Sequence, residues 1–341
     1  MENLTTTTHR ILTNNKQRQI SVLWLIGILA FSAFVIAGNT ITANAAQTNL
    51  TGEWVAQLDS EKPSVLNMMF SRRTEKSSFF MKTNSFSLNE LQGLTPTATS
   101  SAKTNVNFRI VRESGTFECE GYFGEGRGAG FWTLVPNEEF VSALRGGGYD
   151  NLSGEDLLRA ALHDLTTKFI EDLKSAGYDR LEFEQIIRAK THNITPGFIR
   201  EMQSAGFENL TMEQLIRAKN HTINSEYVKK AQAMGFERQS LETLIRMRNH
   251  SITPEFVSQM RSAGFENLSI EQLIRLKNHS VTAEFVNDLK AEGYASISPE
   301  TAIRLKNYKI DRDFILRAKA KGYSDVSLEE LIKLRNRNIV N

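Results

Sequence analysis

The chain has 341 residues, of which 40% are hydrophobic and 23% charged, and this composition excludes a disordered or collagen-like protein. Its 41 Lys and Arg against 39 Asp and Glu leave a net charge of +2, which excludes the strongly basic field on which non-specific nucleic-acid binding depends. The single cysteine, Cys119, excludes an internal disulfide framework and any zinc or iron–sulfur site that needs several cysteines.

Residues 1–46 have the features of an export signal. Three basic residues within 10–18 precede an uncharged apolar run over 22–37, and the triplet 43–45 has the small-x-small spacing of a cleavage site. An uncleaved membrane anchor is the alternative, because the apolar run falls just short of the roughly 20 residues that span a bilayer. The sequence therefore predicts a periplasmic or extracellular protein that contacts a membrane only through this segment.

Residues 47–136 are predicted to form a small β domain. Short β-rich runs are separated by clusters of Gly, Ser, Thr, Asn and Pro. Six strands favour an antiparallel sandwich or small barrel. The glycine-rich stretch 124–130 lies between two of them and opens no helix, so it predicts a hairpin connection and not a phosphate-binding loop. Cys119 shares a strand face with two phenylalanines and is predicted to be buried. The predicted strands are 53–58, 65–70, 79–86, 106–112, 116–123 and 130–135.

Residues 137–341 contain a seven-fold repeat. A Gly-Tyr/Phe pair recurs every 29 residues from Gly148 to Gly322, and a motif Ser/Thr-x-Glu-x-Leu-Ile-Arg keeps the same period. Each unit spells out two short helices, each with its own N-cap residue and apolar face. Helices of about ten residues are not stable alone, so the units must stack into an α-solenoid of about fourteen helices.

Caps in the repeat are predicted individually. One helix of each unit begins after Thr211, Ser240, Ser269 or Ser327, with capping boxes at Gln214, Gln272 and Glu330. The other begins after a Thr, Asn or Asp, with Pro196 and Pro254 at its first position in two units. This second helix is predicted to end at Gly177 and its equivalents in a Schellman motif. The N-caps of the second helix are Thr195, Asn224, Thr253, Thr282 and Asp311.

Two columns of basic residues are the candidate partner-binding residues. In the first, a Glu and an Arg stand four apart on one helix, the favourable orientation for an ion pair within that helix. A solvated, self-paired face is one reading, and a ladder that binds carboxylates or phosphates of a partner is the other. The second column projects between apolar positions, where long stems pack on apolar surface or the charged ends line a groove. The candidates are Arg188, Arg217, Arg246, Arg275 and Arg304 in the first column, and Lys219, Arg248 and Lys277 in the second.

Five histidines keep the 29-residue register. Packed helices lie roughly 8–10 Å apart, too far for neighbouring imidazoles to share a zinc ion, so no metal and no cofactor are predicted. A polar helix end or a pH sensor are the readings that remain. The histidines are His163, His192, His221, His250 and His279.

The repeat motif LIR-x-KNH, followed by Val/Ile-Thr-x-Glu-Phe-Val and an Ala-Gly-Phe ending, resembles the extracytoplasmic repeats behind some bacterial BlaR-type membrane metallopeptidase domains. The segment 112–131, RESGTFECEGYFGEGRGAGF, is similar to the β domain that often precedes those repeats. Family members often carry Gly after the His, where this chain has Asn193, Thr222, Ser251 and Ser280. The peptidase motif is absent, so the resemblance implies a bacterial envelope setting in sensing or assembly and transfers no catalytic residue.

The sequence therefore predicts a non-enzymatic, exported scaffold that binds an envelope protein or peptide and no nucleic acid. The common hydrolase, nucleotide-binding and redox motifs are missing. The alternative function is binding of a glycan or lipid by the β domain, with the solenoid as a spacer. In that alternative Trp54, Phe131 and Trp132 stack on a sugar. An enzyme is a third possibility, with a site assembled from distant residues. The oligomeric state is not predicted.

Overall fold

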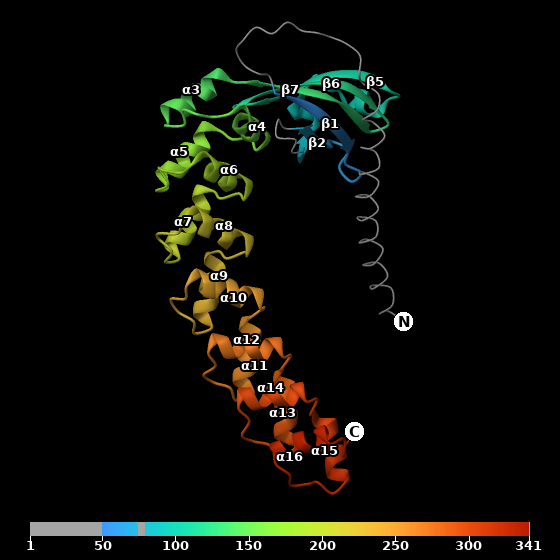
Figure 1. The fold of residues 1–341 in the computed structure, drawn as a ribbon, viewed down its shortest axis with the longest axis vertical. Coiled ribbons are helices and arrows are strands. Elements are labelled where there is room, and N and C mark those ends of the chain that lie inside the picture. The colour runs from blue at the N-terminus through green and yellow to red at the C-terminus, as the bar shows by residue number, and fades with distance from the viewer. Residues whose placement is uncertain (1–49, 74–78, 341) are drawn as a thin grey trace. The chain divides into compact units, whose positions relative to one another are not determined.

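The computed structural model describes residues 50–73 and 79–340. The predicted export segment, with its alternative as an anchor, lies outside the described residues. Seven antiparallel strands are followed by fourteen nine-residue helices within residues 138–336 (Figure 1). This architecture confirms the predicted fold class, a small antiparallel β domain followed by an α-solenoid. No helix in the described part of the chain is long and apolar enough to cross a membrane.

The strands pair in the order β3-β2-β1-β7-β6-β5-β4, and the sheet curls into a half-barrel (Figure 1). All six predicted strands are present. The two-residue strand β4 was not predicted, because two residues are too few to show an alternating pattern. The predicted hairpin at 124–130 joins β6 to β7, with Glu125 and Gly126 both in the left-handed region that such tight turns need. The strands are β1 Leu50–Leu58, β2 Val65–Arg73, β3 Phe79–Ser87, β4 Leu91–Gln92, β5 Thr104–Arg112, β6 Gly115–Gly124 and β7 Arg127–Pro136.

Aromatic side chains fill the inner face of the sheet. Trp54 and Trp132 are fully buried, and the indole N–H of Trp54 donates to the backbone oxygens of Glu120 and Phe131 at 3.2 and 3.1 Å. Strands β6 and β7 approach each other closely here. Their approach requires glycine at 130, where a Cβ would lie 1.9 Å from the Glu120 oxygen. Cys119 is buried as predicted, and burial raises the pKa of its thiol.

The fourteen helices alternate between two kinds. We call α4, α6, α8, α10, α12, α14 and α16 the A helices and α3, α5, α7, α9, α11, α13 and α15 the B helices, and a unit is a B helix with the A helix that follows it. The short helices η1 (Leu88–Glu90) and α2 (Pro96–Ser100) belong to the β domain. The bounds are α3 Glu138–Gly146, α4 Gly154–Leu162, α5 Thr167–Ser175, α6 Phe183–Thr191, α7 Pro196–Ser204, α8 Met212–Asn220, α9 Ser225–Ala233, α10 Leu241–Asn249, α11 Pro254–Ser262, α12 Ile270–Asn278, α13 Ala283–Ala291, α14 Pro299–Asn307, α15 Arg312–Ala320 and α16 Leu328–Asn336.

The predicted N-caps are confirmed. Each predicted cap side chain accepts from the backbone N–H three residues on, and the capping boxes at Gln214 and Gln272 are present. The box predicted at Glu330 is wrong, because only the bond from the Glu330 N–H to Ser327 forms there. The B helices end in the predicted Schellman geometry. At α5, Gly177 has a φ of 96° and the Tyr178 N–H donates to the Leu173 oxygen at 3.0 Å. These local signals fix where each helix starts and stops.

The A helices end in the same way, but without glycine. The residue after each histidine is left-handed, with φ between 52° and 57° in the first four units: Asp164, Asn193, Thr222 and Ser251. The Ile223 N–H donates to the Ala218 oxygen at 2.8 Å, so the turn closes although Thr222 is β-branched. A β-branched residue pays the highest steric cost in this region, and Thr222 is exposed and free to change.

Replacing Thr222 by Gly is expected to raise the free energy of unfolding by about 0.5–1 kcal/mol, because relief of the left-handed strain outweighs the added freedom of the unfolded chain. Urea unfolding of both proteins measures the change. The matched control is Gly206→Ala, at a left-handed position with open space around its Cβ, which should lower stability by about 1 kcal/mol. Equal stability of Thr222→Gly and the parent would contradict the strain.

The hydrophobic core runs without a break through units two to seven. One cluster of buried side chains extends from Leu173 in α5 to Val340 after α16. At the other end Leu158, Ala161 and Leu162 of α4 belong to the core of the β domain. The first A helix therefore belongs to both domains, and the sheet takes the place that a preceding unit would occupy.

Candidate functional site

The Glu and Arg column forms salt bridges between neighbouring A helices. Arg217 of α8 lies 2.6 Å from Glu242 of α10, and the same pair recurs at every step from α4 to α16. The predicted pair within one helix is therefore replaced by a pair between units, because stacking places each Arg beside the Glu 25 residues on. We call this set the Arg–Glu ladder. Its rungs are Arg159–Glu184, Arg188–Glu213, Arg217–Glu242, Arg246–Glu271, Arg275–Glu300 and Arg304–Glu329, with N–O distances of 2.5–3.2 Å.

The β domain supplies one further rung. Arg72 of β2 lies 2.6 Å from Glu155 of α4, the Glu that has no preceding unit to pair with. Asn84 of β3 donates to the Leu162 backbone oxygen at the end of α4 at 2.8 Å. The sheet thus provides the first A helix with an ion-pair partner and a hydrogen-bond donor, as another unit would.

The histidines form a second ladder on the same face. The Nδ1–H of His221 donates to the Oδ1 of Asn249 in the next unit at 2.9 Å, because a carbonyl oxygen can only accept. We call this set the His–Asn ladder, and it supports the reading of a polar helix end. Within the described residues no three potential ligands gather to hold a metal ion. Its rungs are His192–Asn220, His221–Asn249, His250–Asn278 and His279–Asn307.

His163 differs from the other four. Its ring nitrogens lie 2.7 and 2.8 Å from the Lys82 amine of β3, and Nδ1 also contacts the Thr191 hydroxyl at 3.0 Å. Burial, then the positive charges of Lys82 and Arg159, lower the pKa of His163 from 6.5 to about 4, with Glu184 opposing them. Burial also lowers the pKa of Lys82 to about 8. This histidine sits where the sheet meets the solenoid.

Lowering the pH from 7 to 5 is expected to weaken this junction by about 1 kcal/mol. Between pH 6.5 and 4 the unfolded chain takes up a proton at His163 that the folded chain does not. The contribution of His163 is therefore full above pH 6.5 and falls as the pH falls. Urea unfolding at both pH values measures the loss. His163→Asn should remove most of it and His221→Asn should not; the same pH dependence in His163→Asn would refute the assignment.

The second basic column packs on aromatic rings. Lys219 of α8 has its amine 4.6 Å from the centre of the Phe198 ring in α7, within the distance of a cation–π contact. The first unit has Ala161 at this place, so among the described residues no cation of this column lies over its ring, Phe140. These residues therefore stabilise each unit from within. The pairs, 4.6–5.3 Å apart, are Lys190–Phe169, Lys219–Phe198, Arg248–Tyr227, Lys277–Phe256, Lys306–Phe285 and Arg335–Phe314.

Two further sets of contacts between units were not predicted. In five of the B helices, α5, α7, α11, α13 and α15, a long polar side chain near the helix end donates to the last carbonyl of the preceding B helix, as Arg261 does to the Met234 oxygen at 2.6 Å. Where a Tyr follows the Gly, its hydroxyl donates to a backbone oxygen of the next unit, as Tyr178 does to Leu210 at 2.6 Å. The sequence signal is the 29-residue period of these columns. The other pairs are Lys174–Gly147, Gln203–Ala176, Lys290–Ala263 and Lys319–Glu292 in the first set, and Tyr149–Leu181 and Tyr294–Val326 in the second.

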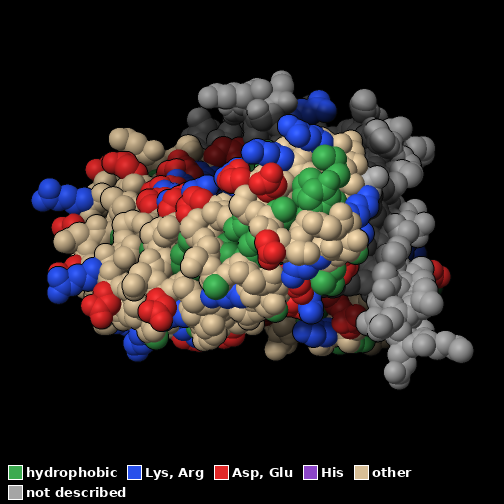
Figure 2. Space-filling model, turned by 90° about the horizontal axis from the view of Figure 1, so that it is seen from below, with side chains coloured by type: hydrophobic (Ala, Val, Ile, Leu, Met, Phe, Trp, Pro, Cys, Tyr) green, Lys and Arg blue, Asp and Glu red, His purple; other side chains and the backbone are tan. Residues whose placement is uncertain are grey.

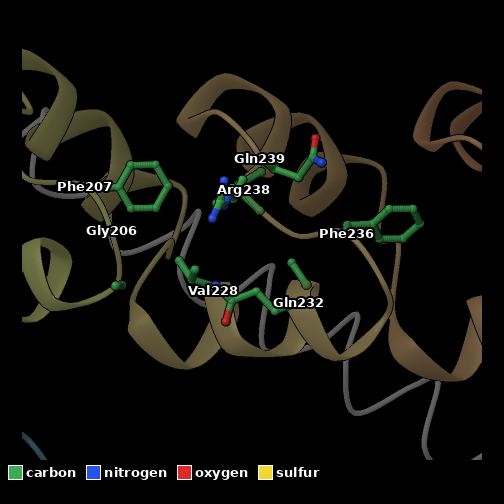
Figure 3. Close-up of a pocket in the computed structure, with 10 residues that line it drawn as sticks. Gly206, Phe207, Val228, Gln232, Phe236, Arg238 and Gln239 are labelled. Atoms are coloured by element: carbon green, nitrogen blue, oxygen red, sulfur yellow. The ribbon is translucent and has the colours of Figure 1, made fainter.

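A pocket of about 430 Å³ opens in the fourth unit, residues 224–252. Its apolar wall comes from the end of α7, from α9 and from α10, and its rim carries two glutamines and an arginine. Phe207 and Phe236 lie at its two ends, with Arg238 between them and Val228 and Gln232 opposite (Figure 3). Its residues are Ala205, Gly206, Phe207, Val228, Ala231, Gln232, Phe236, Arg238, Gln239 and Leu244.

All eight candidate residues of the two basic columns already have a partner inside the protein. The arginine side chains of the Arg–Glu ladder nevertheless stay between 41% and 53% exposed from Arg188 to Arg304. On the face that includes the C-terminal units, acidic and basic side chains alternate without a broad area of one charge (Figure 2). The solenoid therefore presents an ordered, charge-balanced surface.

The alternative function predicts three aromatic residues that stack on a sugar, and this prediction is wrong for two of them. Trp54 and Trp132 point into the core of the β domain and are 0% exposed, because the strand glycines make room for their rings. A buried ring cannot stack on a sugar. Phe131 lies on the opposite face of β7 and is 42% exposed.

No protein-family model matches the chain, and the search of curated proteins finds no match either.

Proposed function

We propose that this protein is a non-enzymatic scaffold that binds another protein or peptide in the bacterial cell envelope, after export. The observation that carries the proposal is the Arg–Glu ladder, because it holds at least five exposed guanidinium groups in one line along stacked helices. Solenoids use such extended surfaces to bind partners. The resemblance to the repeats behind BlaR-type peptidase domains supports the envelope setting and a part in sensing or assembly.

The ladder suits a partner that carries both charges. Each guanidinium has five N–H donors and uses one or two of them in hydrogen bonds to its Glu, so its other N–H groups can donate to a partner. An acceptor on a partner can use these donors without breaking the rung. The ladder fixes the side chains in advance, which lowers the entropy lost on binding.

The alternative function, glycan or lipid binding by the β domain, has less support. It keeps only Phe131 of its three stacking residues. The outer sheet face around Phe131 also carries Glu53 and Glu120, its neighbours on the paired strands. A single exposed ring between two carboxylates is a weak platform for a sugar.

Cross-linking in intact cells of the source organism, followed by mass spectrometry, tests the scaffold. The full chain is compared with the triple variant Arg217→Glu, Arg246→Glu, Arg275→Glu, and with a swapped variant that adds Glu242→Arg, Glu271→Arg and Glu300→Arg. The swapped variant restores every altered rung and the net charge, so a loss of binding in it reports the changed positions of the guanidinium groups and not a broken ladder. Recovery of one envelope protein by the parent and its loss from both folded variants supports the proposal. Recovery of no specific protein by the parent would contradict it.

A further inference from the structure

The pocket in the fourth unit exists because two columns of the repeat change there together. The residue that packs between units near the end of each B helix is Leu or Met in five units, Ala231 in the fourth and Ala318 in the seventh. The residue before each A-helix cap is Leu, Ile or Val in six units, and is Gln239 in the fourth. Both changes remove apolar volume from one place. The neighbouring side chains are already close-packed and do not move in to fill this space, so a pocket remains.

The rim of the pocket also lacks the contacts that join other units. Gln232 stands where Lys174 and Arg261 donate to the last carbonyl of the preceding B helix, and among the described residues it makes no such bond to Ala205. Phe207 stands where Tyr178 donates its hydroxyl to the next unit, so the backbone oxygen of Gln239 has no tyrosine donor. The rim therefore keeps two backbone oxygens and the amide of Gln232 for hydrogen bonds with another chain. The amide of Gln239 donates to the Glu237 backbone oxygen at 3.0 Å.

Arg238 adds a positive charge to the rim, and its backbone conformation differs from that of the other units. Its φ is 53°, whereas the corresponding residues of the other six units do not have a positive φ. Left-handed backbone is sterically costly at a residue other than glycine, and at this position of the repeat it occurs in the fourth unit alone. Arg238 is exposed and, within the described residues, pairs with no carboxylate. Its side chain lies between Phe207 and Phe236 at the mouth of the pocket (Figure 3).

We propose that this pocket binds an extended peptide segment of a partner protein, which inserts one large apolar side chain and places an Asp or Glu carboxylate on Arg238. The buried wall of Val228, Ala231 and Leu244 suits the apolar side chain. The free carbonyls and the Gln232 amide suit a peptide backbone, which offers both donors and acceptors. Arg238 selects for a neighbouring carboxylate. The inference rests on the proposed scaffold function and names the chemistry of a partner.

The test is selection from a phage library of random dodecapeptides on the purified full chain. Affinities of the selected peptides are then measured by fluorescence anisotropy. The key variant is Ala231→Met with Gln239→Leu, which restores the residues of the third unit and so fills the pocket without threatening the fold. Arg238→Asn removes the charge with the residue found at Asn209 and Asn267. Its matched control is Arg180→Asn, the same change in the second unit.

Selected peptides are expected to share a large apolar residue beside Asp or Glu. They should bind the filled variant at least tenfold more weakly, Arg238→Asn about threefold to tenfold more weakly, and Arg180→Asn unchanged. Equal binding to the filled variant, or selection of no peptide, would overturn the proposal. Binding of only a small hydrophobic dye, abolished in the filled variant, would overturn it too, by showing a small-molecule pocket. These outcomes are independent of capture in cells, so failure there would count against the scaffold function alone.

Discussion

Replacing Trp132 by Ala is expected to lower the free energy of unfolding of the β domain by about 3–5 kcal/mol. Trp132 is fully buried, its ring contacts Phe70 and Phe117 edge-on, and its indole N–H donates to the Glu53 backbone oxygen at 3.0 Å. Truncation leaves a cavity and removes the indole hydrogen bond to the Glu53 oxygen, and both losses add to the lost transfer free energy. Urea unfolding followed by circular dichroism measures the effect.

The matched control is Phe131→Ala, one residue away on the exposed face of β7. It should change stability by less than about 0.5 kcal/mol. A stable Trp132→Ala protein that has lost binding to a glycan or lipid would contradict the structural role of Trp132 and favour the alternative function.

Replacing Leu273 by Ala in α12 is expected to cost about 2–5 kcal/mol. Leu273 is fully buried in the core shared by successive units. In a solenoid each unit contacts only its neighbours, so the loss should be felt first in the units around the change. The C-terminal units have fewer neighbours to hold them, and α11 to α16 should open before the rest.

Hydrogen exchange read by mass spectrometry shows where protection falls. The expected result is loss of protection over residues 254–340 with retention over the β domain and α4 to α8. Glu284→Ala, an exposed change in α13, is the control and should leave protection as it is. Equal loss along the whole chain would show a single cooperative unit and contradict the stacking of separable units.

The sequence predicts the local structure of this protein closely because its signals are local. Caps such as Thr211 and stops such as Gly177 act within four residues, and repetition presents each of them several times. Strands were predicted from their alternation, and the burial of Cys119 from its face. The short strand β4 lacks such a signal and follows from pairing with β5.

The contacts between units were harder to predict. Arg217 has a Glu four residues away in its own helix, and only stacking shows that Glu242 of the next unit is the partner. The burial of Trp132 depends on Gly52, which is distant in sequence and lies on the strand paired with β7. The pocket does have a signal in the sequence, because two positions of the repeat carry a different kind of residue in the fourth unit. Ala231 and Gln239 are two such changes in one unit.

The scaffold function is tested most directly by photo-cross-linking in cells of the source organism. A photoreactive amino acid replaces Arg217, Arg246 or Phe131, one per variant, and the loss of one rung costs only about 0–1 kcal/mol. The account predicts that one and the same envelope protein is cross-linked from Arg217 and Arg246 and not from Phe131. Cross-linking from Phe131 alone, to a protein, lipid or glycan, would contradict the account and move the binding surface to the β domain.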